Sequence, residues 1–431
     1  MPKSKSSSRK KSKPTHKPSK PVKPAKPVKS AKTISGAAAG DPVFAQPMPS
    51  PDPTSFRDPV TDQNDQEINA VSPVPQPTGN AVEPVITLAQ VYGSQGNTIT
   101  TTITNAGQIV FHSVGDTGSP SGPTTQNLVS DKMVADFDEA NAADEPSFFY
   151  HLGDVVYYFG ESTYYYDQFY DPFRSYPAPI VAIPGNHDGV VWSGDPAPTL
   201  QGFLENFCTP AAAPAPDAGG LLRTTMTQPG VYFTFEAPFV RILGVYSNVL
   251  EDPGVISDQN GTYPTLDQRQ VAFLTAALER VKTDSFTGAV IIAVHHPPFT
   301  GGSDHGGSPD MLADIDTACT AAGVWPHAVF SGHSHNYQRY TRTVNGLSIS
   351  YLVAGCGGHS PLSKMSGTYR TPYTIDSTLT LESYDDTDFG YLRVVVTATT
   401  MTIEFHPQHD GGTTKTPDDT VTIDLQTYAV S

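Results

Sequence analysis

Five short segments of this 431-residue chain carry Asp, Asn, Tyr and His side chains at spacings that suit metal-dependent chemistry. Carboxylates and phenolates are hard anionic oxygen donors, whereas imidazole suits divalent transition metals. Two cations about 3.5–4 Å apart can hold both the attacking and the leaving oxygen of an in-line phosphoryl displacement. The segments predict such a two-metal site; in chain order they are Gly115-Asp116-Thr117-Gly118, Gly153-Asp154-Val155-Val156-Tyr157, Gly185-Asn186-His187-Asp188, His295-His296-Pro297 and Gly332-His333-Ser334-His335.

Each segment follows, within three residues, a short apolar run that is typical of a buried strand. In α/β sheets, ligands collect where the carboxyl ends of strands and their loops converge. One such segment alone would more often be a turn, but five of them at five strand ends predict one shared site. The runs are 109–111, 148–150, 180–183, 289–294 and 328–330.

The remaining pattern mixes helices with antiparallel strands. Apolar spacing predicts a helix over 266–282, with a capping box at Thr265 and Gln268, and a weaker helix over 128–140. Further strands are expected at 231–235, 240–246 and 349–353, and alternating segments near the end predict antiparallel strands at 391–396, 401–405 and 420–423.

The five segments resemble those of the calcineurin-like metallophosphoesterases, in which the first segment usually reads Asp-x-His. Here Gly118 stands at the His position, and Tyr157 follows Asp154 by three residues. This exchange resembles the purple acid phosphatase branch, in which a Tyr phenolate binds a ferric ion. The resemblance implies an α+β or α/β fold: a four-layer sandwich of two mixed β-sheets flanked by helices, in the one-domain form of the branch.

The resemblance also implies a ligand set for each metal. Asp154 would bridge the two metals, an Fe(III) ion and a divalent Fe, Zn or Mn ion. His296 is an alternative to His295, and Tyr158 is a weaker alternative to Tyr157. The first metal would take Asp116, Asp154, Tyr157 and His335, and the second would take Asp154, Asn186, His295 and His333.

Two further His residues are expected to act on the substrate. His187, beside Asn186, is the candidate general acid or phosphate donor, with Asp188 placed to orient it. The family places a substrate-contacting His ten residues after the His that begins His-x-Pro, and His305 has that offset from His295. The family often has another His just before it, whereas this chain has Asp304.

The function that this pattern favours is acid phosphomonoester hydrolysis, in which a metal-held hydroxide attacks phosphorus. A phosphodiesterase with the same metal site is the near alternative. A metal-holding binding module with little turnover is an alternative of a different class.

The chain begins with a low-complexity region, residues 1–84, whose first 32 residues are strongly basic. Residues 1–32 contain 11 Lys and one Arg and no acid, so they cannot bury enough apolar surface to fold, and we expect a disordered arm and linker over 1–84 before a catalytic domain over 85–431. Beyond residue 32, 14 basic residues face 43 acidic ones, a formal charge of −29. The arm is therefore a candidate contact for polyanions.

We recognise neither a signal peptide nor an apolar run long enough to span a membrane. The three Cys residues have no metal-type spacing, so the redox compartment of the protein stays open.

Overall fold

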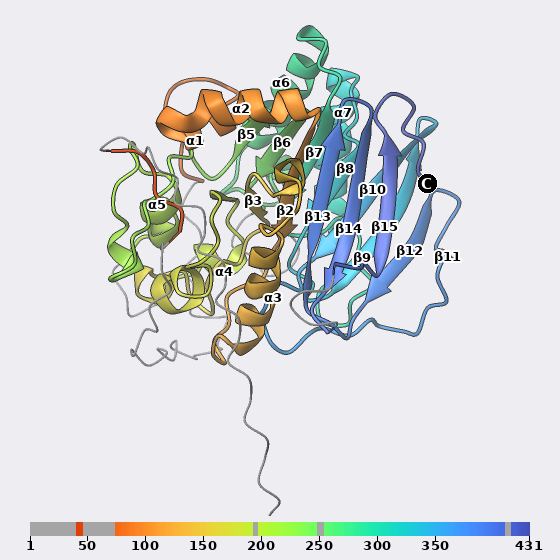
Figure 1. Cartoon of the computed structure of the whole chain (residues 1–431). Helices are drawn as coiled ribbons and strands as arrows, with labels where there is room; N and C mark the ends of the chain where they lie inside the picture. The colour runs from red at the N-terminus through yellow and green to blue at the C-terminus, as the bar shows by residue number, and fades with distance from the viewer. Residues whose placement is uncertain (1–39, 46–73, 193–196, 248–253, 410–414) are drawn as a thin grey trace, which may run out of the picture.

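The computed structural model describes residues 40–45, 74–192, 197–247, 254–409 and 415–431. Within these ranges two mixed β-sheets face one another, with helices on their outer sides, as the family resemblance implies (Figure 1). The nine-stranded sheet has the order β1 (Val85–Thr87), β5 (Phe233–Ala237), β6 (Val240–Val245), β7 (Ala289–Val294), β8 (Ala328–Ser331), β10 (Leu347–Ala354), β9 (Tyr337–Val344), β12 (Leu379–Asp385), β11 (Tyr373–Thr374). The six-stranded sheet has the order β15 (Asp419–Asp424), β14 (Thr400–Pro407), β13 (Gly390–Thr397), β2 (Gln108–Val114), β3 (Phe149–His151), β4 (Ile180–Ala182).

All five apolar runs that precede the polar segments are strands. β2, β3 and β4 are neighbouring parallel strands of one sheet, and β7 and β8 are neighbouring parallel strands of the other. β7 is buried along its whole length, which explains its unbroken Ala, Val and Ile sequence. The predicted antiparallel strands near the C-terminus are confirmed as β13, β14 and β15.

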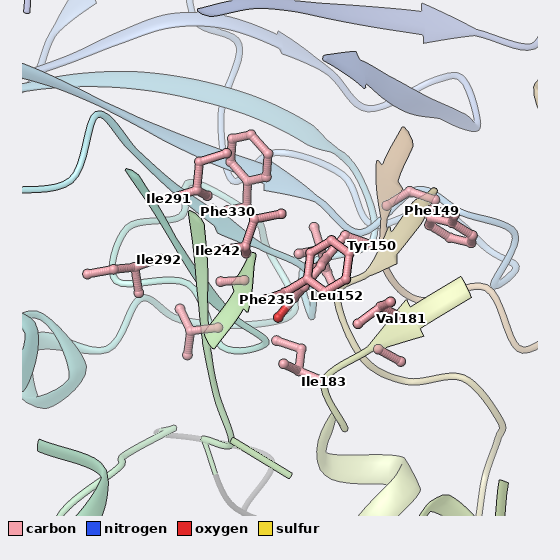
Figure 2. Close-up of a cluster of buried hydrophobic side chains, with 14 of the residues drawn as sticks. Phe149, Tyr150, Leu152, Val181, Ile183, Phe235, Ile242, Ile291, Ile292 and Phe330 are labelled. Atoms are coloured by element: carbon pink, nitrogen blue, oxygen red, sulfur yellow. The ribbon is translucent and has the colours of Figure 1, made fainter. Parts of the chain in front are cut away.

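Side chains from both sheets meet in one apolar core. Figure 2 shows Tyr150 and Val181 of the six-stranded sheet beside Phe235 and Ile242 of the nine-stranded sheet. The rings of Phe148 and Phe235 pack across the two sheets with centroids 4.8 Å apart. Full burial of one such side chain contributes about 1.5–3 kcal/mol, so this layer rigidly fixes the strand ends that carry the polar segments.

The helices cover the outer faces of the sheets. α6 (Arg269–Thr283) and α7 (Pro309–Ala322) pack together on the nine-stranded sheet, and α3 (Thr124–Ala135) lies against β13 (Figure 1). α6 confirms the predicted helix, but its capping box is wrong: the N-cap is Gln268, which makes no side-chain cap, and its amide donates to Asp258 instead. The remaining α-helices are α1 (Leu88–Val91), α2 (Gly96–Ala106), α4 (Asn186–Gly189) and α5 (Gln201–Phe207).

Part of the predicted linker packs on the folded body. Val43 exchanges backbone and side-chain hydrogen bonds with Thr224, and the ring of Phe44 packs edge-on against Tyr92 at 5.3 Å. Thr78 donates its backbone N–H to Pro229. Residues 41–45 and 74–84, which belong to the expected linker, thus contact the folded body through hydrogen bonds and an aromatic pair. The predicted disordered arm, residues 1–32, lies outside the described residues.

Candidate metal centre

The five polar segments converge at one edge of the sandwich, as their positions after parallel strands predict. A first group of side chains surrounds the phenol oxygen of Tyr157. That oxygen lies 2.9 Å from Asp116 Oδ1, 2.8 Å from Asp154 Oδ2 and 3.2 Å from His335 Nε2. His335 Nε2 also lies 3.4 Å from Asp116 Oδ1. Four side chains from three segments thus direct their polar atoms to one point. Two of these segments follow strands of the six-stranded sheet, and the third follows a strand of the nine-stranded sheet.

A second group adjoins the first and shares Asp154. Asn186 Oδ1 lies 3.1 Å from both His295 Nε2 and His333 Nδ1. His295 Nε2 lies 3.2 Å from Asp154 Oδ2. Candidate ligand atoms of Asp154, His295 and His333 all lie within 4.8 Å of one another. The seven side chains proposed from sequence therefore form two overlapping groups with one carboxylate in common.

Three of these seven residues have a left-handed backbone. Asp116 has φ 57°, Asp154 has φ 54° and His333 has φ 66°. This region is unfavourable for side chains other than Gly, and such residues cost on the order of 1–3 kcal/mol each when the surrounding structure holds them there. Residues of this kind persist only where the surrounding structure holds them, and they cluster at active sites and ligand-binding sites.

The glycines of the segments leave room for the carboxylates. A Cβ atom on Gly185 would lie 2.1 Å from Asp154 Oδ1, and one on Gly332 would lie 2.4 Å from Asp116 Oδ2. Any larger residue would displace these carboxylates. This close approach explains why Gly precedes Asn186 and His333.

The charges in the two groups perturb each other strongly. Burial lowers the pKa of His295, but the carboxylates of Asp154 and Asp116 outweigh that effect and raise the pKa to about 9. Burial, together with the same two carboxylates, raises the pKa of Tyr157 well above its usual value of 10. Without a cation, the phenol is therefore a neutral hydrogen-bond donor to Asp116 and Asp154.

The donor set fits two cations of different character. Tyr157 and Asp116 add anionic oxygens to the first group, while Asn186 and the two imidazoles of the second group supply neutral donors. A cation among the oxygens of the first group would oppose the effect of the carboxylates on the Tyr157 phenol, as metal ions do for coordinated acidic groups. We find both groups chemically suited to hold metal.

His187 lies at the rim of the first group. Its ring centroid is 4.3 Å from that of Tyr157, and its Nδ1 donates to the Tyr158 carbonyl at 2.8 Å. Its backbone N–H donates to Asp154 Oδ1 at 2.9 Å. Because Nδ1 is engaged, Nε2 is the ring atom left to act on a substrate.

The expectation that Asp188 orients His187 is wrong. The Asp188 carboxylate is buried and accepts backbone N–H groups from Val155, Val156 and Gly185 at 2.8–3.2 Å. It therefore holds the loop after β3 rather than the imidazole. Burial and the neighbouring Asp154 charge raise the pKa of Asp188 to about 7.

His305 and His296 lie beside the second group. The His305 ring centroid is 4.1 Å from that of His333 and 5.6 Å from that of His335, so the Gly-rich loop does bring His305 to the site. His296 is buried, pairs through Nδ1 with Ser247 Oγ at 2.7 Å and packs on His333 at 4.1 Å. Of the two candidates in His-His-Pro, the structure places His295 among the polar atoms, and His296 lies one layer behind it.

Two residues at the site were missed by sequence reasoning. The His359 ring lies 3.9 Å from that of Tyr157, and its Nδ1 donates to the Gly118 carbonyl at 3.1 Å. Gln168 pairs with the Tyr157 backbone. Neither residue lies in one of the five polar segments. The Gly357-Gly358 turn before His359 could have indicated a site residue, whereas no sequence pattern marks Gln168.

Comparison with known proteins assigns the family. The family model of the calcineurin-like phosphoesterases matches residues 113–337, which contain all five segments. The chain belongs to the calcineurin-like phosphoesterase family. This metallophosphoesterase family implies metal-dependent hydrolysis of phosphoesters.

Solved structures align with this chain at low sequence identity, and the first of them, with a TM-score above 0.5, shares the fold. "GAP50 the anchor in the inner membrane complex of Plasmodium" is 13% identical, with a TM-score of 0.52 over 74% of this chain and 89% of that chain. The structure of PhoD is 12% identical, with a TM-score of 0.44 over 83% of this chain and 73% of that chain.

In a search of curated proteins, none matches this phosphoesterase chain. Over the described residues, the phosphoesterase has no helix with the length and apolar character needed to cross a membrane.

Proposed function

We propose that this phosphoesterase is a binuclear-metal acid phosphomonoesterase of the purple acid phosphatase type. Its first metal would be Fe(III), held by Asp116, Asp154, Tyr157 and His335. Its second metal would be a divalent Fe, Zn or Mn ion, held by Asp154, Asn186, His295 and His333.

The observation that carries this proposal is the position of the Tyr157 oxygen between the carboxylates of Asp116 and Asp154. The position where most family members have a His is Gly118, and no side chain fits there. A Cβ atom on Gly118 would lie 2.8 Å from both Val155 O and Val156 Cα. A phenol oxygen thus takes the place beside the first group that a His at residue 118 cannot reach.

Beside the metals, side chains of the protein contact the phosphoryl group and donate a proton. When bound, two cations would supply the charge that holds the phosphoryl oxygens and would lower the pKa of an attacking water. His187 and His305 would contact the phosphoryl group from opposite sides, and this role is supported by their ring contacts, of His187 with Tyr157 and of His305 with His333. His187 Nε2 is the atom proposed to give a proton to the leaving oxygen.

Metal analysis and substrate comparison test this proposal together. We expect aerobically purified protein to hold two metal equivalents, at least one of them iron, and to show a visible phenolate-to-iron absorption band. It should hydrolyse an aryl phosphomonoester faster than the matching bis-ester at acidic pH. Faster cleavage of the bis-ester would favour the phosphodiesterase alternative, and bound metal without hydrolysis of either ester would favour a binding module.

A further inference from the structure

Among the described residues, three buried Gln side chains each bind the backbone N–H and carbonyl of one other residue through two hydrogen bonds. Gln228 accepts the N–H of Ala182 and donates to its carbonyl, both at 2.8 Å. Gln270 does the same for Tyr246 at 2.8 and 2.7 Å. Gln168 does the same for Tyr157 at 2.9 and 2.5 Å. We call this two-point arrangement a glutamine clasp.

The clasp works because a primary amide carries the same donor and acceptor as a peptide group. One Gln side chain can therefore replace a neighbouring strand for a single residue, where no strand is available. Gln228 and Gln270 extend the ends of β4 and β6 in this way. A buried N–H and carbonyl left without such partners would each be costly.

Gln168 differs from the other two because the residue that it holds points a side chain into the site. It is fully buried and lies in a one-turn π-helix, Tyr166–Tyr170. Single-turn π-helices are frequently found at functional sites. With its backbone held on both sides, Tyr157 directs its phenol oxygen to Asp116 and Asp154.

Gln168 also fills the space next to Gly118. A Cβ atom on Gly118 would lie 2.9 Å from Gln168 Oε1. The side chain that holds Tyr157 in place therefore helps to exclude a side chain at residue 118. The exchange of His for Tyr in this site therefore involves three residues. Gln168 binds the backbone of Tyr157, and its side chain leaves room only for Gly at residue 118.

We propose that Gln168 is a positioning residue that fixes the Tyr157 phenol oxygen as a metal ligand. The proposal rests on the proposed function, in which that oxygen binds Fe(III). Gln168 itself touches neither metal nor substrate in this proposal, and acts only through the backbone of Tyr157.

The test compares Gln168→Leu with Gln270→Leu in the full chain. Both changes remove one glutamine clasp and leave an apolar side chain of similar size, but Tyr246, held by Gln270, contributes no side chain to either ligand group. Partners behind metal ligands typically contribute about 10–100-fold to metal affinity. We expect Gln168→Leu to weaken iron binding by about that factor and to shift the maximum of the phenolate-to-iron band. Gln270→Leu should lower thermal stability but leave the band at the wild-type wavelength.

A metal-free measurement makes the result independent of the metal assignment. Tyr157→Phe removes the phenol hydrogen bonds, so its effect on the free energy of unfolding should shrink in a Gln168→Leu background if Gln168 positions the hydroxyl. The same cycle with Gln270→Leu should be additive. Additive effects in both cycles, or an unchanged band in Gln168→Leu, would overturn the proposal. A wild-type protein that holds iron without any such band would instead contradict the proposed function, and the metal-free cycle would then still decide whether Gln168 orients Tyr157.

Discussion

The phenol oxygen of Tyr157 lies 2.8 Å from Oδ2 of Asp154, the carboxylate three residues before it on the same loop. The left-handed turn at Asp154 and the backbone grip on Tyr157 bring the two side chains to one point. Asp154 belongs to both groups of candidate ligands, whereas Tyr157 belongs to one. Changes at these two residues should therefore have different consequences.

Tyr157→Phe should abolish the visible band and leave the fold intact. The ring still packs between its neighbours, but the oxygen that would bind iron is gone. We expect iron to be lost from the first group while divalent metal remains in the second. Absorption spectra and metal analysis of wild type and variant check this, and a variant that keeps the wild-type band would show that another residue is responsible.

Asp154→Ala should be the most damaging single change at the site. It removes the carboxylate that both groups share, so two cations would repel each other at close range without a bridge. We expect loss of both metals and of hydrolysis. Metal analysis, with circular dichroism as a control for folding, provides the measurement; two retained metal equivalents would mean that a different residue bridges them.

The sequence predicted the strands that matter most and the residues that they carry. β7 shows why: its unbroken Ala, Val and Ile run is typical of a strand buried on both faces, and His295 follows it directly. The five motif-bearing strands follow from such local patterns, whereas the family and the fold class follow from the resemblance of the five polar segments to those of the calcineurin-like metallophosphoesterases. Convergence of the segments on one point also followed, because parallel strands end at the same edge of a sheet.

Long-range partners could not be predicted in the same way. Asp188 stands next to His187 in sequence, yet its carboxylate binds the backbone of the loop after β3, because that buried loop has N–H groups to satisfy. His359 lies 241 residues from Gly118, whose carbonyl it contacts. Such pairings depend on how loops from the two sheets meet, and no spacing within one segment records this.

His187→Ala should lower turnover far more than metal content. The imidazole lies beside Tyr157 without belonging to either ligand group, and its Nδ1 is already bonded to the Tyr158 carbonyl. A general acid contributes about 10²–10⁴-fold, so kcat should fall by that factor for alkyl phosphates, which have poor leaving groups. Nitrophenyl phosphate should lose much less, because its leaving group needs no proton. Equal losses on the two substrates would assign His187 to phosphate positioning instead.

Asp136→Asn should destabilise the protein near neutral pH and change its response to acid. The buried Asp136 carboxylate lies between β2, α3 and β13 and belongs to neither ligand group; it accepts hydrogen bonds from His112 Nε2 at 2.9 Å and from Tyr391 at 2.7 Å. Burial alone would raise the pKa of Asp136, but His112, Tyr391 and Lys415 hold it well below its usual value. Burial in turn lowers the pKa of His112, so that ring is a neutral donor at pH 7.

Because the pKa of Asp136 is lowered in the folded state, its charged form stabilises the protein above the unfolded pKa of about 4, and that stabilisation is lost as pH falls below it. We expect Asp136→Asn to cost about 2 kcal/mol of unfolding free energy at pH 7, as for hydrogen bonds to a charged group. The difference between wild type and variant should narrow between about pH 5 and pH 2. Urea unfolding of both proteins in chelator, at several pH values, measures this. Titration of Asp154 and of the other site carboxylates is common to both proteins, so it cancels in the difference between their unfolding free energies. If that difference stayed constant with pH, Asp136 would not be ionised in the folded state.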